Sequence, residues 1–177
     1  RRHEFARANN LLMPLFDAAI RKRLRAPGEP LEPYAEKDGW LGDISQWKEG
    51  GSKIAPFGKF TGDRAKTVWL PDAKTAAAWH AFVTFKPVLK LKSPPGLGDG
   101  QPFILRKVNE PIEVIAAGTP KVEGPIEIWA GAEKLGELKQ GKLTVKFTQP
   151  GFYPVYLKAV GDSGEVVRSR PNTLIVE

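Results

Sequence analysis

Hydrophobic and polar positions follow two different patterns along the chain, and the change falls near residue 100. After Phe103, short runs alternate apolar and polar residues; they cover 112–115, 126–129, 143–147, 153–160, 166–169 and 173–176. Segments rich in Gly, Pro and Asp separate them. Short alternating strands with turns every eight to twelve residues or so are typical of a small antiparallel β-sandwich. Pro154 lies inside one run, so we expect an edge strand or a bulge there.

The first part of the chain has the spacing of an amphipathic helix. Its apolar residues recur at three- and four-residue steps: Phe5, Ala8, Leu12, Leu15 or Phe16, Ala19 and Ile20. Such a face must be buried. Pro14 places the regular part of the helix at about Asn10 or later, because proline fits a first turn but breaks a helix interior. Pro27-Gly28 is expected to end it.

Between these two regions the pattern is weaker. Residues 28–66 contain many Gly and Pro, yet aromatic residues are spread through them, which predicts an ordered but irregular wrap over the body. Residues 66–70 are expected to form a short strand. A second helix is predicted from Ala73 to about Phe85, with Asp72 as its N-cap. His80 lies off its apolar stripe, which favours a surface or satisfied histidine over a ligand.

These patterns predict a mixed fold in three segments. Residues 1–88 form a mostly helical and irregular N-terminal part, 89–101 a Pro- and Gly-rich linker, and 102–177 an all-β sandwich. The charge divides at about the same place, since residues 1–97 carry 17 basic and 10 acidic side chains, whereas residues 98–177 carry 10 of each.

Composition narrows the chemistry. The 177 residues are 41% hydrophobic and 27% charged, as in a folded protein. The absence of cysteine excludes disulfides, thiolate metal sites and a cysteine nucleophile. No apolar stretch is long enough for a membrane span, and no metal or cofactor site is predicted. The basic cluster Arg21, Lys22, Arg23 and Arg25 suits the carbonyl end of a helix, and no nucleic-acid partner is expected because no such motif accompanies it.

The C-terminal segment resembles the last strands of bacterial immunoglobulin-like domains. The likeness lies in the Pro-Gly-aromatic turn Pro150-Gly151-Phe152, a long strand, the Asp162-Ser163-Gly164 hairpin and the closing strand Thr173-Leu174-Ile175-Val176. It covers roughly residues 102–177 and implies an immunoglobulin-like sandwich. It implies little about function.

Residues 1 to about 88 are similar to the C-terminal end of bacterial α/β-hydrolases of the dienelactone-hydrolase or prolyl-oligopeptidase kind. The likeness rests on His3-Glu4-Phe5 before a helix and on two motifs, Trp40-Leu41-Gly42-Asp43 and Trp69-Leu70-Pro71-Asp72. It implies that His3 is a catalytic base that takes the proton from a serine upstream of Arg1. The chain has no G-x-S-x-G, so this fragment alone is expected to be inactive, while the intact exported parent would hydrolyse esters or peptide-like bonds.

Other functions stay open. The aspartates Asp17, Asp38, Asp43, Asp63 and Asp72 are spaced like turn and cap residues rather than metal ligands. Exposed tryptophans on one surface, drawn from Trp40, Trp47, Trp69 and Trp129, would form a sugar-stacking platform, although a core position is favoured for Trp129. The alternatives are a non-catalytic carbohydrate- or protein-binding accessory module, or a structural spacer.

The expected partners follow from these hypotheses. They are the upstream hydrolase region of the same protein and a carbohydrate or cell-surface ligand, in an extracytoplasmic location. The hydrolase hypothesis makes one structural prediction: Phe5, Leu12, Phe16 and Ile20 should leave an uncovered apolar face.

Overall fold

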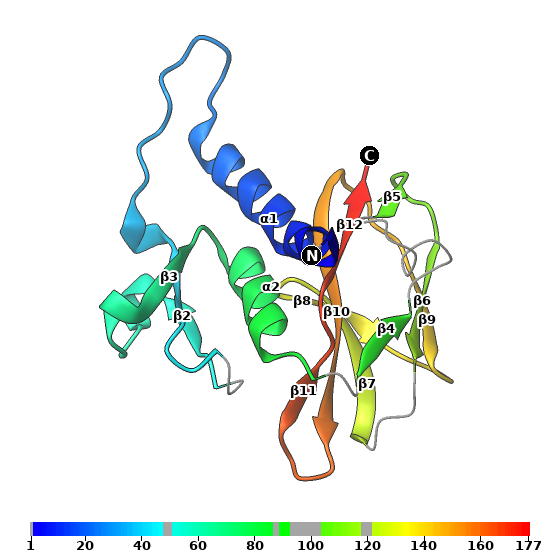
Figure 1. The fold of residues 1–177 in the computed structure, drawn as a ribbon. Helices are drawn as coiled ribbons and strands as arrows, with labels where there is room; N and C mark the ends of the chain where they lie inside the picture. Colours follow the sequence, from blue (N-terminus) through cyan, green and yellow to red (C-terminus); the bar gives the residue numbers. More distant parts are fainter. Residues whose placement is uncertain (1, 48–50, 87–88, 93–103, 118–121) are drawn as a thin grey trace.

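A β-sandwich forms one half of the molecule, and two helices and a small sheet form the other (Figure 1). The computed structural model describes residues 2–47, 51–86, 89–92, 104–117 and 122–177, without the side chains of residues 2–10, 92 and 104. Both helices lie against one face of the sandwich, and the small sheet covers the far side of the second helix (Figure 1).

The larger sheet of the sandwich is built around one long central strand, β10 (Gly151–Gly161). Its strand order is β5 (Ile104–Arg106), β12 (Asn172–Val176), β10, β7 (Val122–Ala130) and β8 (Glu133–Glu137), and β11 (Val166–Arg168) also pairs with β10. The facing sheet has the order β4 (Lys90–Lys92), β6 (Ile112–Ala117) and β9 (Lys142–Val145). All pairings are antiparallel except that of β12 with β5.

The sandwich core lies between these two sheets. Ile128 and Leu157 are fully buried at its centre, and Leu89, Val114, Phe147 and Leu174 pack around them. Full burial of one such side chain stabilises the folded state by about 1.5–3 kcal/mol relative to leaving it exposed. The alternating pattern predicted the runs that contain Val114, Ile128, Phe147, Leu157 and Leu174, whereas Leu89 lies in the segment expected to be a linker. Strand β4 extends the sandwich back to Lys90, inside the segment expected to be a linker, while most of that segment, 93–101, lies outside the described residues.

Pro154 is neither on an edge strand nor at a bulge, so that expectation was wrong. It pairs in register with Thr173 of β12, and its carbonyl accepts a hydrogen bond of 2.9 Å from the Gly131 amide. Strand β7 ends at Ala130. The nitrogen of Pro154 therefore lies beside the end of β7. The absence of an N–H group there costs no hydrogen bond between the two strands.

Helix α1 (Arg2–Arg23) begins earlier than expected and carries Pro14 in its interior. A proline there costs about 3 kcal/mol in an isolated helix. Pro14 is buried, and α1 packs against β10, β12 and the second helix, α2 (Ala73–Thr84). Tertiary packing thus offsets the local cost, which the sequence pattern alone does not reveal.

Two short strands, β1 (Trp40–Asp43) and β2 (Ile54–Pro56), lie in the segment expected to be irregular, and β3 (Thr67–Leu70) lies where a short strand was predicted. They form a three-stranded antiparallel sheet with the order β2, β1 and β3. A 3-10 turn at 36–38 precedes β1, and two more, 57–59 and 64–66, lie between β2 and β3. Strands β1 and β3 pair the two Trp-Leu motifs, with Leu41 opposite Trp69. A small core of Leu70, Ala76 and Trp79 joins the sheet to α2.

Asp43 and Asp72 cap chain reversals, as predicted. The Asp72 carboxylate accepts a 2.7 Å hydrogen bond from the Thr75 amide at the start of α2, and that of Asp43 accepts one of 2.8 Å from the Ser45 amide.

Candidate binding cleft and docking face

His3 lies in the first turn of α1 rather than on a loop before it. Its side chain is not among those that the structure describes, and its catalytic role stays a prediction. His80, in contrast, is a satisfied structural histidine. Its Nε2 lies 2.9 Å from the Ser52 carbonyl oxygen, which can only accept, so Nε2 donates the proton.

Stability at mildly acidic pH should depend on His80. Burial, together with the positive charge of Arg168, lowers the pKa of its imidazole below 6.5. As the pH falls, His80 is therefore protonated in the unfolded chain before it is protonated in the folded chain. The contribution of neutral His80 to the free energy of unfolding is present above about pH 6.5 and is lost as the pH falls below it. Urea unfolding at about pH 7.5 and 5.5 should show a smaller acid loss for His80→Gln than for the wild type. Equal losses would contradict this assignment.

The tryptophans lie in different settings and do not share a platform. Trp40 packs against the small core near α2. The Trp69 indole donates to the Glu36 carbonyl at 3.0 Å and meets Tyr34 edge-on, with ring centroids 5.0 Å apart. Trp47 is exposed. Trp129 is half-buried on the outer face of the larger sheet, so the core position favoured for it was wrong.

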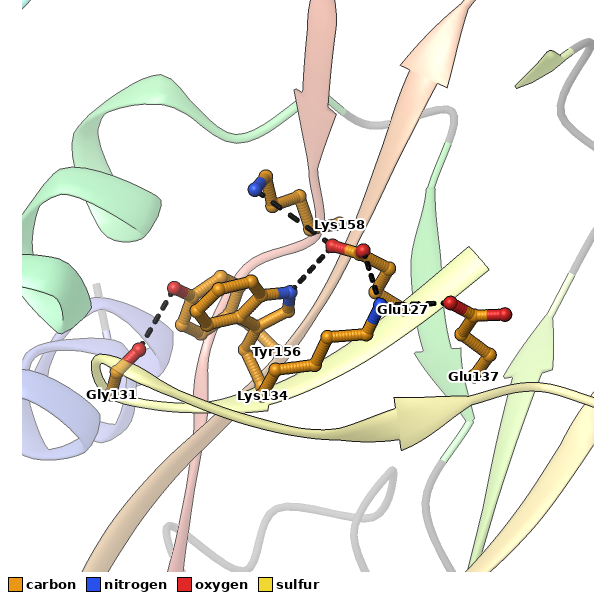
Figure 2. Close-up of polar contacts among 7 residues, drawn as sticks. Glu127, Gly131, Lys134, Glu137, Tyr156 and Lys158 are labelled. Carbon is orange, nitrogen blue, oxygen red and sulfur yellow. Dashed lines mark hydrogen bonds and ion pairs between the residues drawn. The ribbon is translucent and has the colours of Figure 1, made fainter. Parts of the chain in front are cut away.

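The surroundings of Trp129 form a charged network on that outer face (Figure 2). Its indole donates to the Glu127 carboxylate at 2.8 Å, and the Lys158 ammonium lies 4.6 Å from its ring centroid. Lys134 bridges Glu127 and Glu137, at 2.7 and 2.8 Å. The hydrogen bond from Lys134 lowers the pKa of Glu127. Charged side chains of this kind are common on edge strands such as β8, where they discourage pairing with another chain.

A cleft of about 290 Å³ lies where α1, the start of α2 and the start of β10 meet. Its polar side chains come from three elements: Asp17, Arg21 and Lys22 from α1, Asp72 and Lys74 from the α2 end, and Gln149 before β10. Phe152 and Tyr153 supply aromatic surface. Arg21 Nε donates to both oxygens of Asp17, at 2.9 and 3.0 Å.

Lys74 is the distinctive residue of this cleft. Its ammonium lies 4.4 Å from the centroid of the Tyr153 ring. Burial lowers the pKa of Lys74, and the charges of Asp17 and Asp72 oppose that shift. A cation in the first turn of a helix is also unfavourable to the helix dipole. A lysine in the first turn of a predicted helix is therefore the sequence signal that points to Lys74, and the hydrophobic pattern does not reveal it.

Gly131 lies directly against Lys74. A Cβ atom at Gly131 would lie 2.5 Å from Lys74 Cγ and 3.2 Å from its Cα, so only glycine permits this approach of α2. The Gly131 carbonyl accepts a 2.9 Å hydrogen bond from the buried Tyr156 hydroxyl (Figure 2). Burial raises the pKa of Tyr156 to about 12.

A second hollow of about 220 Å³ lies beside the cleft, with Lys22 in the walls of both. Its wall includes Glu32, Tyr34, Asp38 and Trp69. The Lys22 ammonium reaches the Asp38 carbonyl at 3.4 Å. No group of three or more acidic, histidine or cysteine side chains suited to a metal ion occurs among the described residues.

The outer face of α1 is apolar and uncovered. Leu12, Phe16, Ile20 and Leu24 have exposed fractions of 37, 56, 52 and 60%; they follow one another at four-residue steps, with Leu24 directly after the last helical residue, Arg23. Leu31, in the loop that extends beyond the end of α1 (Figure 1), is also exposed. The prediction of an uncovered face is confirmed for Leu12, Phe16 and Ile20, whereas the Phe5 side chain lies outside the described part of the chain.

No protein-family model and no curated protein matches this sequence. Among solved structures, the fibronectin(III)-like modules of Clostridium thermocellum CbhA are 15% identical over 50% of this chain and 93% of theirs, with a TM-score of 0.41. The sulfur carrier protein SoxY from Chlorobium limicola f thiosulfatophilum is 10% identical over 52% of this chain and 81% of its own, with a TM-score of 0.36.

A third similar structure is Bacteroides ovatus SGBP-B in complex with a mixed-linkage heptasaccharide. It is 15% identical over 42% of this chain and 21% of its own, with a TM-score of 0.27. At such scores the immunoglobulin-like assignment rests on the two packed sheets described above. An α/β-hydrolase body is not seen: the small sheet of the N-terminal part is antiparallel in the described residues, whereas that fold has a mostly parallel sheet. No described helix is long and apolar enough to cross a membrane.

Proposed function

We propose that this chain is a non-catalytic accessory module, in which an immunoglobulin-like sandwich is joined to a neighbouring folded domain through α1. The observation that supports the proposal is the apolar outer face of α1, formed by Leu12, Phe16, Ile20 and Leu24. Contiguous exposed apolar surface of this kind marks an interaction site.

The geometry of the helix favours a folded protein domain as the partner. Residues at four-residue steps form a straight ridge that fits the groove of another helix. The opposite side of α1 is already occupied, because Pro14 and Ala18 are buried against the body. Helix α1 is therefore apolar on two faces, which is typical of a helix packed between two bodies. Phe16 is 56% exposed, so burying the rest of it would contribute about half of the 1.5–3 kcal/mol that full burial of such a side chain provides.

The hydrolase resemblance supplies one identity for the neighbour. An upstream α/β-hydrolase domain of the same exported protein would pack on α1, and His3 would complete its serine triad. This is a second candidate that differs from the main proposal, because the chain would then contribute one residue, His3, to catalysis, while the sandwich remained an accessory module.

Thiol labelling tests the docking face cleanly because the chain contains no cysteine. The Phe16→Cys variant should react rapidly with a maleimide in the isolated chain. In a protein in which this chain is joined to the proposed neighbouring domain, its rate should fall at least about tenfold, since a residue packed in an interface is shielded from reagent.

Val166→Cys is the matched control. Val166 is 43% exposed and lies on β11, away from α1. It should react at the same rate in both proteins. Equal rates for Phe16→Cys in the two proteins would overturn the docking proposal, whatever the hydrolase activity of the longer protein.

A further inference from the structure

We infer that the cleft between α1, α2 and β10 binds one acidic sugar unit, a hydroxylated ring that carries a carboxylate. This inference is independent of the docking face, because the cleft lies on the side of α1 that faces the body.

The first argument is the state of Lys74. Lys74 is half-buried, its ammonium lies 4.4 Å from the Tyr153 ring centroid, and it has no hydrogen-bond or salt-bridge partner among the described residues. The ammonium has three N–H donors and is in contact with solvent, so these donors are available to a ligand. A ligand carboxylate in the cleft would satisfy them with charge-assisted hydrogen bonds. The start of α2 beside it also favours negative charge.

The second argument concerns hydrogen-bond donors. Asp17 and Asp72 line the same cleft, together with Arg21, Lys22 and Lys74. Each carboxylate retains lone pairs beyond those used by Arg21 and by the Thr75 amide, and these can accept further hydrogen bonds. Sulfate brings no donor for them. A ligand with hydroxyl groups supplies donors to the aspartates, while its own carboxylate accepts from Lys74.

The third argument is size and surface. A cavity of about 290 Å³ is at the lower end of small-ligand sites, which run from roughly 300 to 1,000 Å³, and suits a single ring. Phe152 and Tyr153 provide apolar contact for the carbon face of that ring. The basic excess of residues 1–97, 17 basic against 10 acidic side chains, would steer a polyanionic glycan toward this half of the molecule.

Two sugars that differ only at one carbon test this inference: glucuronate, with a carboxylate, and glucose, with a hydroxymethyl group. Titration of the ¹⁵N-labelled chain, followed by NMR, should shift the amides of Lys74, Arg21 and Tyr153 with glucuronate. Glucose should bind at least about tenfold more weakly, which corresponds to the loss of one charge-assisted hydrogen bond.

Lys74→Met should lower the affinity for glucuronate to that for glucose. Lys158→Met is the matched control, because Lys158 also lies over an aromatic ring, 4.6 Å from the Trp129 centroid, but does not line the cleft. It should leave the affinity unchanged. Asp17→Asn should weaken the binding of both sugars. Equal binding of the two sugars, no binding of either, or full glucuronate affinity in Lys74→Met would each overturn the inference.

Discussion

Replacing Gly131 with alanine is expected to lower the free energy of unfolding by about 3 kcal/mol and to displace Lys74 from the cleft. Gly131 has φ of +58°, in the left-handed region, where a Cβ atom costs about 1–2 kcal/mol. The new methyl group would also lie 2.5 Å from Lys74 Cγ, and overpacking of this kind costs about 1–3 kcal/mol. Urea unfolding measures the first effect, and amide chemical shifts of residues 72–76 measure the second.

Gly164→Ala separates the two contributions. Gly164 has a similar φ of +80°, but a Cβ atom there meets nothing within 4 Å. Gly164→Ala should lower the free energy of unfolding only by the cost of a left-handed backbone conformation, about 1–2 kcal/mol. The amide chemical shifts of the cleft residues should not change. If Gly131→Ala and Gly164→Ala proved equally destabilising, the close approach of α2 to Gly131 would not be a stabilising constraint.

Leu157→Ala should destabilise the chain by about 3–4 kcal/mol, within the range of about 2–5 kcal/mol seen for buried leucines. Leu157 is fully buried at the centre of β10, and it pairs with Ile128 of β7. Removing its side chain leaves a cavity in a core that both sheets share. Because β10 also contacts α1 and α2, the loss should appear in the unfolding of the whole molecule, followed by circular dichroism and tryptophan fluorescence together.

Val166→Ala is the control for this prediction. Val166 is 43% exposed and lies on β11, which pairs with β10. An exposed substitution of this kind usually changes stability by no more than about 0.5 kcal/mol. A loss for Leu157→Ala as small as that of the control would show that the sandwich core does not limit stability.

The resemblance to α/β-hydrolases and the structure bear differently on function. The resemblance assigns a role to His3, whose side chain lies outside the described residues. The structure instead presents an exposed face on α1 and a charged cleft beneath it, neither of which needs a catalytic triad. Maleimide labelling of Phe16→Cys tests the α1 face, and the sugar titration tests the cleft. Either proposal can therefore fail while the other holds.

The sequence by itself determined the elements whose cause is local. Alternation of apolar and polar residues predicted β6, β7, β9, β10, β11 and β12, because successive side chains of a strand point to opposite faces of the sheet. The N-cap Asp72 and the Asp43 turn followed from the hydrogen bonds that an aspartate makes with nearby amides. His80 followed from its place off the apolar stripe.

Only the tertiary structure decided features that depend on distant contacts. Strands β1 and β2 show no period in the sequence, and the small sheet forms because β1 pairs with β2 and with the expected strand β3, which joins residues far apart in sequence. Pro14 stays helical because α1 packs on the sandwich, and β8, which no alternation marked, is recognised only by its pairing with β7. The cleft exists because Gly131 admits Lys74, and the outer face of α1 is exposed because the body needs only one side of that helix.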